Sequence, residues 1–141
     1  MSEKPFEIVS HTADIAVVVR GDDMQDLFRN AARALNSVLV GDQAEVGREV
    51  EKTVNLDSTD MDALLIDWLN ELLFYADAEQ LVFSDFHFDD VQDGHLSVVC
   101  RGEYLEGSRN LFIREVKAAT YHGSHISQTD NGYMARIVFD V

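Results

Sequence analysis

Two segments of the chain carry apolar residues at helical spacing, three or four positions apart. Gly21-Asp22-Asp23 precedes the first segment and supplies N-cap candidates, while Gly41 is a signal for its end. Ser58-Thr59-Asp60 precedes the second segment in the same way. We therefore expect two amphipathic helices, whose apolar stripes are Met24, Leu27, Phe28, Ala31, Leu35, Val38 and Leu39, and Met61, Leu64, Leu65, Trp68, Leu69, Leu72 and Ala76.

The remaining polar and aromatic residues of the second helix complete this picture. Trp68 and Phe74 are large and apolar, so we expect both in the core. A solvated helix face is typical of the polar residues that fall outside the stripe, which are Asp60, Asp67, Asn70 and Glu71.

The rest of the chain predicts β-strands. The apolar run 15–20 is nearly continuous and rich in Val, which is typical of a central strand, whereas 46–56 alternates like a half-buried one. Gln92-Asp93-Gly94 and Asp130-Asn131-Gly132 are turn signals, each between two strands of a hairpin. The expected strands are 6–9, 15–20, 46–56, 81–90, 95–105, 116–127 and 133–141.

This order of elements, β-β-α-β-α followed by further strands, predicts an α+β fold. We expect two helices packed on one mixed, mainly antiparallel sheet. If strands 15–20 and 46–56 are parallel, the first helix would join them in a right-handed crossover. With 141 residues the chain can bury one sizeable core, so we expect a single domain over 1–141.

Composition narrows the range of partners. The chain has 26 Asp and Glu against 11 Lys and Arg, a formal net charge of −15. Direct binding of nucleic acid is not expected, because neutralising phosphates requires cationic side chains. An acidic surface suits cations and basic partners, or it simply keeps the protein soluble. Both readings are open at this point.

Cysteine content and hydropathy bear on the compartment. The only cysteine, Cys100, lies in the apolar stretch 96–100 and is expected in the core rather than in a disulfide or a thiolate cluster. No apolar run reaches the roughly 18 residues of a membrane span. The first five residues lack the apolar stretch of a signal peptide. We therefore expect a cytoplasmic protein without membrane association.

Candidate chemistry gathers at two places near the ends of the sequence. The last strand ends on Phe139-Asp140-Val141, which sets the Asp140 carboxylate beside the terminal carboxylate of Val141. His11-Thr12-Ala13-Asp14 interrupts the first apolar run, so Asp14 would add a third carboxylate if the first and last strands lie side by side. Three oxygen donors at one point suit a hard divalent cation.

Other motifs do not indicate an enzyme. His122-Gly123-Ser124-His125 has a spacing that would suit two metal ligands on a helix, but it falls in an expected strand, where the two rings point to opposite faces. We expect a surface or structural role for His125. The sequence contains no nucleotide-binding loop, nucleophile elbow or zinc-protease motif.

Five segments, taken in order, resemble the archease family, the accessory proteins of the GTP-dependent tRNA-splicing RNA ligase. They are His11-Thr12-Ala13-Asp14, Leu27-Phe28-Arg29-Asn30-Ala31-Ala32, Trp68-Leu69-Asn70-Glu71-Leu72-Leu73, Val116-Lys117-Ala118-Ala119-Thr120-Tyr121-His122-Gly123 and Phe139-Asp140-Val141. Any one of them is a weak signal, but the ordered set covers nearly the whole chain.

The resemblance implies a cytoplasmic activator that is not itself an enzyme. Such a protein would promote guanylylation of a histidine on the tRNA-splicing RNA ligase and so allow multiple turnover. The resemblance further implies a divalent cation, calcium first and magnesium or manganese as alternatives, held by the residues matching Asp14, Asp140 and the terminal Val141. It also places Lys117 and His11 on the partner-facing surface.

Three alternatives accompany this expectation. The chain could be an independent metal-dependent hydrolase, although no general base is evident, or a general protein chaperone, which would need an exposed apolar patch. Lys117 could simply form a surface ion pair with Glu115 or Glu103. The sequence leaves the oligomeric state open.

Overall fold

The computed structural model describes residues 4–11, 14–107 and 110–141. Its elements are β1 (Phe6–His11), β2 (Asp14–Gly21), α1 (Met24–Val40), β3 (Val50–Asp57), α2 (Met61–Glu79), β4 (Leu81–Gln92), β5 (His95–Tyr104), β6 (Ala118–Thr129) and β7 (Gly132–Asp140). The two predicted helices and the order of the strands around them are confirmed. β3 and β6 begin later than predicted, because the residues before Val50 and Ala118 belong to connecting segments.

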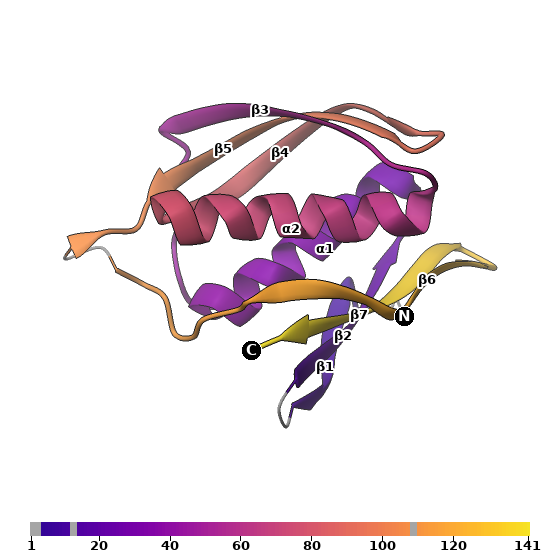
Figure 1. Ribbon diagram of the computed structural model, residues 1–141, viewed down its shortest axis with the longest axis horizontal. Coiled ribbons are helices and arrows are strands. Elements are labelled where there is room, and N and C mark those ends of the chain that lie inside the picture. The colour runs from indigo at the N-terminus through magenta and orange to yellow at the C-terminus, as the bar shows by residue number, and fades with distance from the viewer. Residues whose placement is uncertain (1–3, 12–13, 108–109) are drawn as a thin grey trace.

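The strands form two antiparallel sheets with the helices between them. One sheet has the strand order β1-β2-β7-β6 and the other β3-β5-β4. α1 and α2 fill the space between the sheets, so the molecule has three layers (Figure 1). The α+β class is confirmed, but the strands divide between two antiparallel sheets instead of joining one mixed sheet. The strands that flank α1, β2 and β3, lie in different sheets, so no parallel crossover connects them.

The physical reason for two sheets lies in the helices. Besides its predicted stripe, α2 buries Ile66 and Leu73, which face other directions around the helix axis. A helix that is apolar on several sides must be covered on several sides, and a single sheet covers only one. The second sheet supplies the missing cover through β4, whose Phe86 and Phe88 pack against α2.

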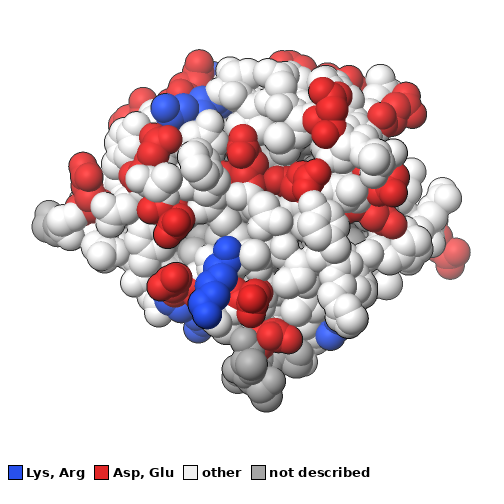
Figure 2. Space-filling view, viewed as in Figure 1, with Lys and Arg blue, Asp and Glu red and all other residues white. Residues whose placement is uncertain are grey.

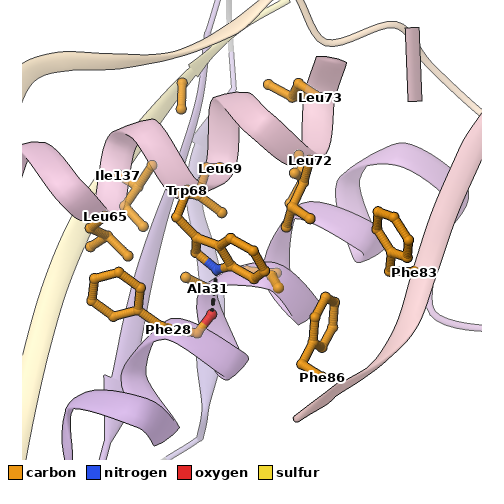
Figure 3. Close-up of a cluster of buried hydrophobic side chains, with 14 of the residues drawn as sticks. Phe28, Ala31, Leu65, Trp68, Leu69, Leu72, Leu73, Phe83, Phe86 and Ile137 are labelled. Atoms are coloured by element: carbon orange, nitrogen blue, oxygen red, sulfur yellow. Dashed lines mark hydrogen bonds between the residues drawn. The ribbon is translucent and has the colours of Figure 1, made fainter. Parts of the chain in front are cut away.

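Trp68 is the centre of the core. It is fully buried, and its Nε1–H donates a hydrogen bond of 3.0 Å to the carbonyl of Phe28 on α1 (Figure 3). Phe86 and Phe88 meet the indole edge-on, each with ring centroids 5.7 Å apart. The prediction for Trp68 is therefore confirmed. The prediction for Phe74 is wrong, because this ring is 58% exposed on the outer side of α2.

The helix ends follow the predicted signals. The Asp23 and Asp60 carboxylates accept hydrogen bonds from the backbone N–H groups of Asp26 and Ala63, both at 2.8 Å, and so cap α1 and α2. Gly41 ends α1 at φ 82°, in the region that favours glycine. In the part of the chain that is described, no helix is long and apolar enough to cross a membrane.

Candidate functional site

Three strands of the larger sheet bring together segments from both ends of the sequence. Asp14, the first residue of β2, pairs directly with Asp140, the last residue of β7, and Asp140 in turn pairs with Ala118 at the start of β6. Directly opposite residues point to the same face of a sheet, with Cβ atoms about 4.5–5.5 Å apart. Asp14 and Asp140 are both exposed. The structure therefore sets these two carboxylates side by side at an open end of the sheet.

Val141 and Lys117 flank this carboxylate pair. Val141 follows Asp140 directly and packs its half-buried side chain against the core. The backbone N–H of Lys117 donates a hydrogen bond of 2.8 Å to the carbonyl of Asp140. The Lys117 side chain is exposed, and no residue among 4–11, 14–107 and 110–141 forms an ion pair with it. The alternative of an ion pair with Glu115 or Glu103 is thus not formed; Glu103 instead accepts the Gly47 N–H at 2.9 Å.

His11 can be placed only by its backbone. It is the last residue of β1 and pairs with Ile15, one position after Asp14. Its side chain, like residues Thr12 and Ala13, lies outside what the structure describes, so its expected role at the partner-facing surface stays a prediction.

Polar residues of α2 form hydrogen bonds to β6, which the sequence did not predict. β6 is the edge strand of its sheet, and α2 runs beside it (Figure 1). Asn70 binds both backbone groups of Ala119: its Nδ2 donates to the Ala119 carbonyl at 3.0 Å, and its Oδ1 accepts the Ala119 N–H at 2.8 Å. Asp62 accepts the Ile126 N–H at 2.9 Å and contacts His125 Nδ1 at 3.1 Å.

Asp67 provides a third link between α2 and β6. It accepts hydrogen bonds from the hydroxyls of Tyr121 and Ser58. The hydrogen bond to Asp67 is the main cause that raises the pKa of Tyr121 above its ordinary value, because the phenol is held in its protonated form. The expectation of a purely solvated face is therefore wrong for Asp67 and Asn70, and Asp60 serves as the N-cap. The missed signal was Asn70 itself, since Asn is a poor helix former and stands here in the middle of a Leu-rich helix.

The His122–His125 motif lies in a break of the ladder between β6 and β7. Thr120 pairs with Val138 and His125 with Arg136, so residues 121–124 bulge out opposite Ile137 alone. Gly123 adopts φ 72° in this bulge. His125 pairs with Asp62 at the surface, which fits the predicted structural role. Nowhere in the described residues do three His, Cys, Asp or Glu side chains gather closely enough to hold a metal ion.

The donor atoms at the start of β2 and the end of β7 are of the type that a hard cation prefers, but they are too few to complete its coordination. Asp14, Asp140 and the terminal carboxylate of Val141 offer only oxygen, the ligand type of calcium and magnesium. Calcium takes 6–8 oxygen ligands, and two side chains with one terminal carboxylate supply fewer. Water or the oxygen atoms of a partner would have to complete such a site.

Comparison with known proteins identifies the family. The chain belongs to the archease family, because the model of the Archease protein family (MTH1598/TM1083) matches residues 6–141. Protein archease of Methanothermobacter thermautotrophicus is 38% identical over 142 residues, which cover 98% of this chain and 99% of the relative. Protein archease of Methanosarcina mazei is 34% identical over 142 residues, covering 98% and 97%.

Two solved structures share the fold. The solution structure of Methanobacterium thermoautotrophicum protein 1598 matches with a TM-score of 0.81 and 36% identity, over 97% of this chain and 99% of that chain. The crystal structure of an archease from Thermotoga maritima, described as a possible chaperone, matches with a TM-score of 0.63 and 20% identity, over 100% and 98%. The arrangement of two helices between two antiparallel sheets is therefore the archease fold.

Proposed function

We propose that this protein is an accessory activator of the GTP-dependent tRNA-splicing RNA ligase and not an enzyme in its own right. In this proposal it promotes guanylylation of the ligase, and hence multiple turnover, through a divalent cation held by Asp14, Asp140 and the Val141 carboxylate. Family membership and the resemblance of the motifs support the choice of partner. The observation that carries the site is the strand register, which sets Asp14 opposite Asp140, with the backbone of the exposed Lys117 bonded to Asp140.

The cation in this proposal is calcium, with magnesium or manganese as alternatives. Two acidic side chains on adjacent strands repel each other unless a cation lies between them, which gives the pair a reason to bind one. When bound, the cation would supply a positive charge that can also attract oxygen atoms of a partner or of a phosphate. The small number of ligands from this chain supports a site that a partner completes.

The partner-facing surface of the proposal comprises Lys117 and His11. A ligase that binds RNA must present cationic groups, and a chain with net charge −15 is attracted to such a surface. Acidic side chains spread over the face that Figure 2 shows, with few Lys and Arg among them. Direct binding of nucleic acid is therefore not part of the proposal, and the cytoplasm is the expected compartment.

Substitution of Lys117 tests the proposal. We expect Lys117→Ala to leave stability and cation binding unchanged, because its side chain is exposed and forms no ion pair with a described residue, but to abolish stimulation of the ligase. The measurement is the amount of guanylylated ligase histidine formed with GTP, with and without this protein. Lys52→Ala is the matched control, since it removes the same charge from β3, where Lys52 pairs with Glu79 at 3.8 Å. Full stimulation by Lys117→Ala would overturn the role of this lysine.

A chaperone function is the second candidate, favoured by the exposed Phe74 and Ile113 side chains, each 58% exposed. A chaperone would suppress aggregation of unrelated unfolded proteins, and Phe74→Ser would weaken that effect. A metal-dependent hydrolase would turn over phosphate esters without the ligase. Under the activator proposal neither activity is expected, and stimulation should be specific for the ligase.

A further inference from the structure

The first residues of β6 form few backbone pairs with the neighbouring strand β7. Only Ala118, Ala119 and Thr120 pair with β7 before the bulge at 121–124 interrupts the ladder. The hairpin turn at the other end of β6 fixes the register of the strand beyond the bulge, but the bulge interrupts the ladder, so that register does not by itself extend to residues 118–120. The register of the short 118–120 segment must therefore be fixed by something else.

That register matters for the candidate site. In the observed pairing Ala118 lies opposite Asp140, and the Lys117 N–H reaches the Asp140 carbonyl. A slip of one residue would move every side chain of the segment to the other face of the sheet. The Lys117 N–H would then no longer reach the Asp140 carbonyl, and the backbone of Lys117 would leave the end of β7.

Asn70 is the group that can fix this register. Its amide satisfies both the N–H and the carbonyl of Ala119, at 2.8 and 3.0 Å, as a neighbouring strand would. Ala119 is only 3% exposed, so water cannot replace these hydrogen bonds without opening the structure. Asn70 itself is held in place by the core, because Trp68, two residues earlier on α2, is fully buried and bonded to α1.

We propose that Asn70 is a positioning residue, which sets the register of the 118–120 segment and so holds the backbone of Lys117 against Asp140, next to the carboxylate pair. The importance of Lys117 in this inference rests on the proposed function, but the positioning itself is a property of the fold. The hydrogen bonds of Asn70 go to the backbone of Ala119 and not to Asp14, Asp140 or Lys117. Asn70 acts only through the backbone of Ala119.

The test compares two variants that release β6 at different places. Asn70→Ala removes the hydrogen bonds to Ala119, and Asp62→Ala removes those to Ile126 and His125 beyond the bulge. We expect both variants to be destabilised, but amide hydrogen exchange measured by NMR should differ. Exchange at Lys117 should accelerate roughly tenfold in Asn70→Ala and stay unchanged in Asp62→Ala, on the scale of one hydrogen bond.

Stimulation of the ligase should differ between the two variants in the same way as the exchange at Lys117. Asn70→Ala should lose at least tenfold in stimulation of ligase guanylylation, whereas Asp62→Ala should retain it. Calcium affinity should change less than twofold in both, because the pairing of β2 with β7 is untouched. Asn70→Asp, which keeps the shape and the acceptor but sets an oxygen against the Ala119 carbonyl, provides a second variant should Asn70→Ala not fold.

The outcomes separate this inference from the proposed function. Unchanged Lys117 exchange in both Asn70 variants would overturn the positioning role, whatever the ligase assay shows. Equal loss of stimulation in Asp62→Ala and Asn70→Ala would also overturn it, since general destabilisation would then suffice. If the wild-type protein does not stimulate the ligase at all, the proposed function fails, and the exchange measurement still decides the role of Asn70.

Discussion

At the scale of single residues, the pairing of Asp14 with Asp140 sets two like charges directly opposite each other. Like charges directly opposite each other destabilise a sheet, yet both carboxylates stand at strand ends, where solvent screens them. Their cost without a cation is therefore small, and a cation turns the repulsion into a common attraction. Under the proposed function, such a pair would fold without a cation and would be stabilised by binding one.

Neutralising the Asp140 carboxylate should weaken cation binding without lowering the stability of the protein. We expect Asp140→Asn to leave the free energy of unfolding unchanged or to raise it by a few tenths of a kcal/mol in the presence of a chelator, because the repulsion is removed. Under the proposed function calcium should raise the melting temperature of the wild-type protein, and this rise should disappear in the variant. Asp89→Asn, an exposed carboxylate on β4, is the matched control and should keep that rise. An undiminished calcium effect in Asp140→Asn would contradict the proposed ligand set.

Cys100 gives a prediction of pH dependence. Burial raises the pKa of this thiol from 9.0 to about 12. Between these values the unfolded chain loses the proton and the folded one keeps it, so stability is complete below pH 9 and falls as the pH rises, by up to about 1.4 kcal/mol per pH unit.

We therefore expect Cys100→Ala to show a shallower loss of stability than the wild type between pH 9 and 11. The measurement is urea unfolding followed by the fluorescence of Trp68. Some slope should remain, because the pKa values of Tyr75 and Tyr121 are raised as well. Identical slopes in both proteins would show that the thiol ionises alike in the folded and unfolded chains.

At the scale of elements, each sheet has a separate task. The β1-β2-β7-β6 sheet carries the candidate site, and the β3-β5-β4 sheet covers the other side of the helices. Gly102 shows how closely the covering sheet is built, because a Cβ atom there would lie 2.1 Å from the Val82 carbonyl oxygen on β4. The backbone itself occupies that space, so only glycine fits.

Gly102→Ala should therefore damage the covering sheet without altering the site. We expect a loss of about 1–3 kcal/mol in the free energy of unfolding, the usual cost of overpacking. Under the proposed function calcium should stabilise the wild type and Gly102→Ala by the same amount. Ser97→Ala in the same strand is the control and should change stability by less than about 0.5 kcal/mol. A changed calcium response in Gly102→Ala would mean that the two sheets are not independent.

At the scale of the whole molecule, the net charge and the C-terminal end are the features that bear on the proposed partner. The net charge of −15 gives association with a cationic partner a long-range attraction that salt weakens. The proposed use of the Val141 carboxylate makes the C-terminal end sensitive to extension, because one added residue would replace that charge by an amide.

Terminal extensions test this last point. We expect a short C-terminal tag to lower stimulation of the ligase at limiting calcium, and the same tag at the N-terminus to have a smaller effect. Raising the salt concentration should weaken stimulation by every form, since the attraction between the two proteins is screened. Equal activity of both tagged forms at limiting calcium would contradict ligation by the terminal carboxylate.

The sequence by itself determined the elements that depend on local pattern. Helical spacing predicted both helices, the segments 21–23 and 58–60 marked their starts, and the turn signals 92–94 and 130–132 marked the hairpins. The motifs and the paired carboxylate segments indicated the family before any fold was known. These features are local because they depend on residues within one turn of helix or one strand.

Only the tertiary structure decided which strands are neighbours. Pattern shows that a face is buried but not what covers it, so it did not reveal the division into two sheets. The direct pairing of Asp14 with Asp140 joins residues from the two ends of the chain, and the hydrogen bonds of Asn70 join a helix to a strand 49 positions away. Contacts of this kind depend on the packing of the whole core, which no local spacing records.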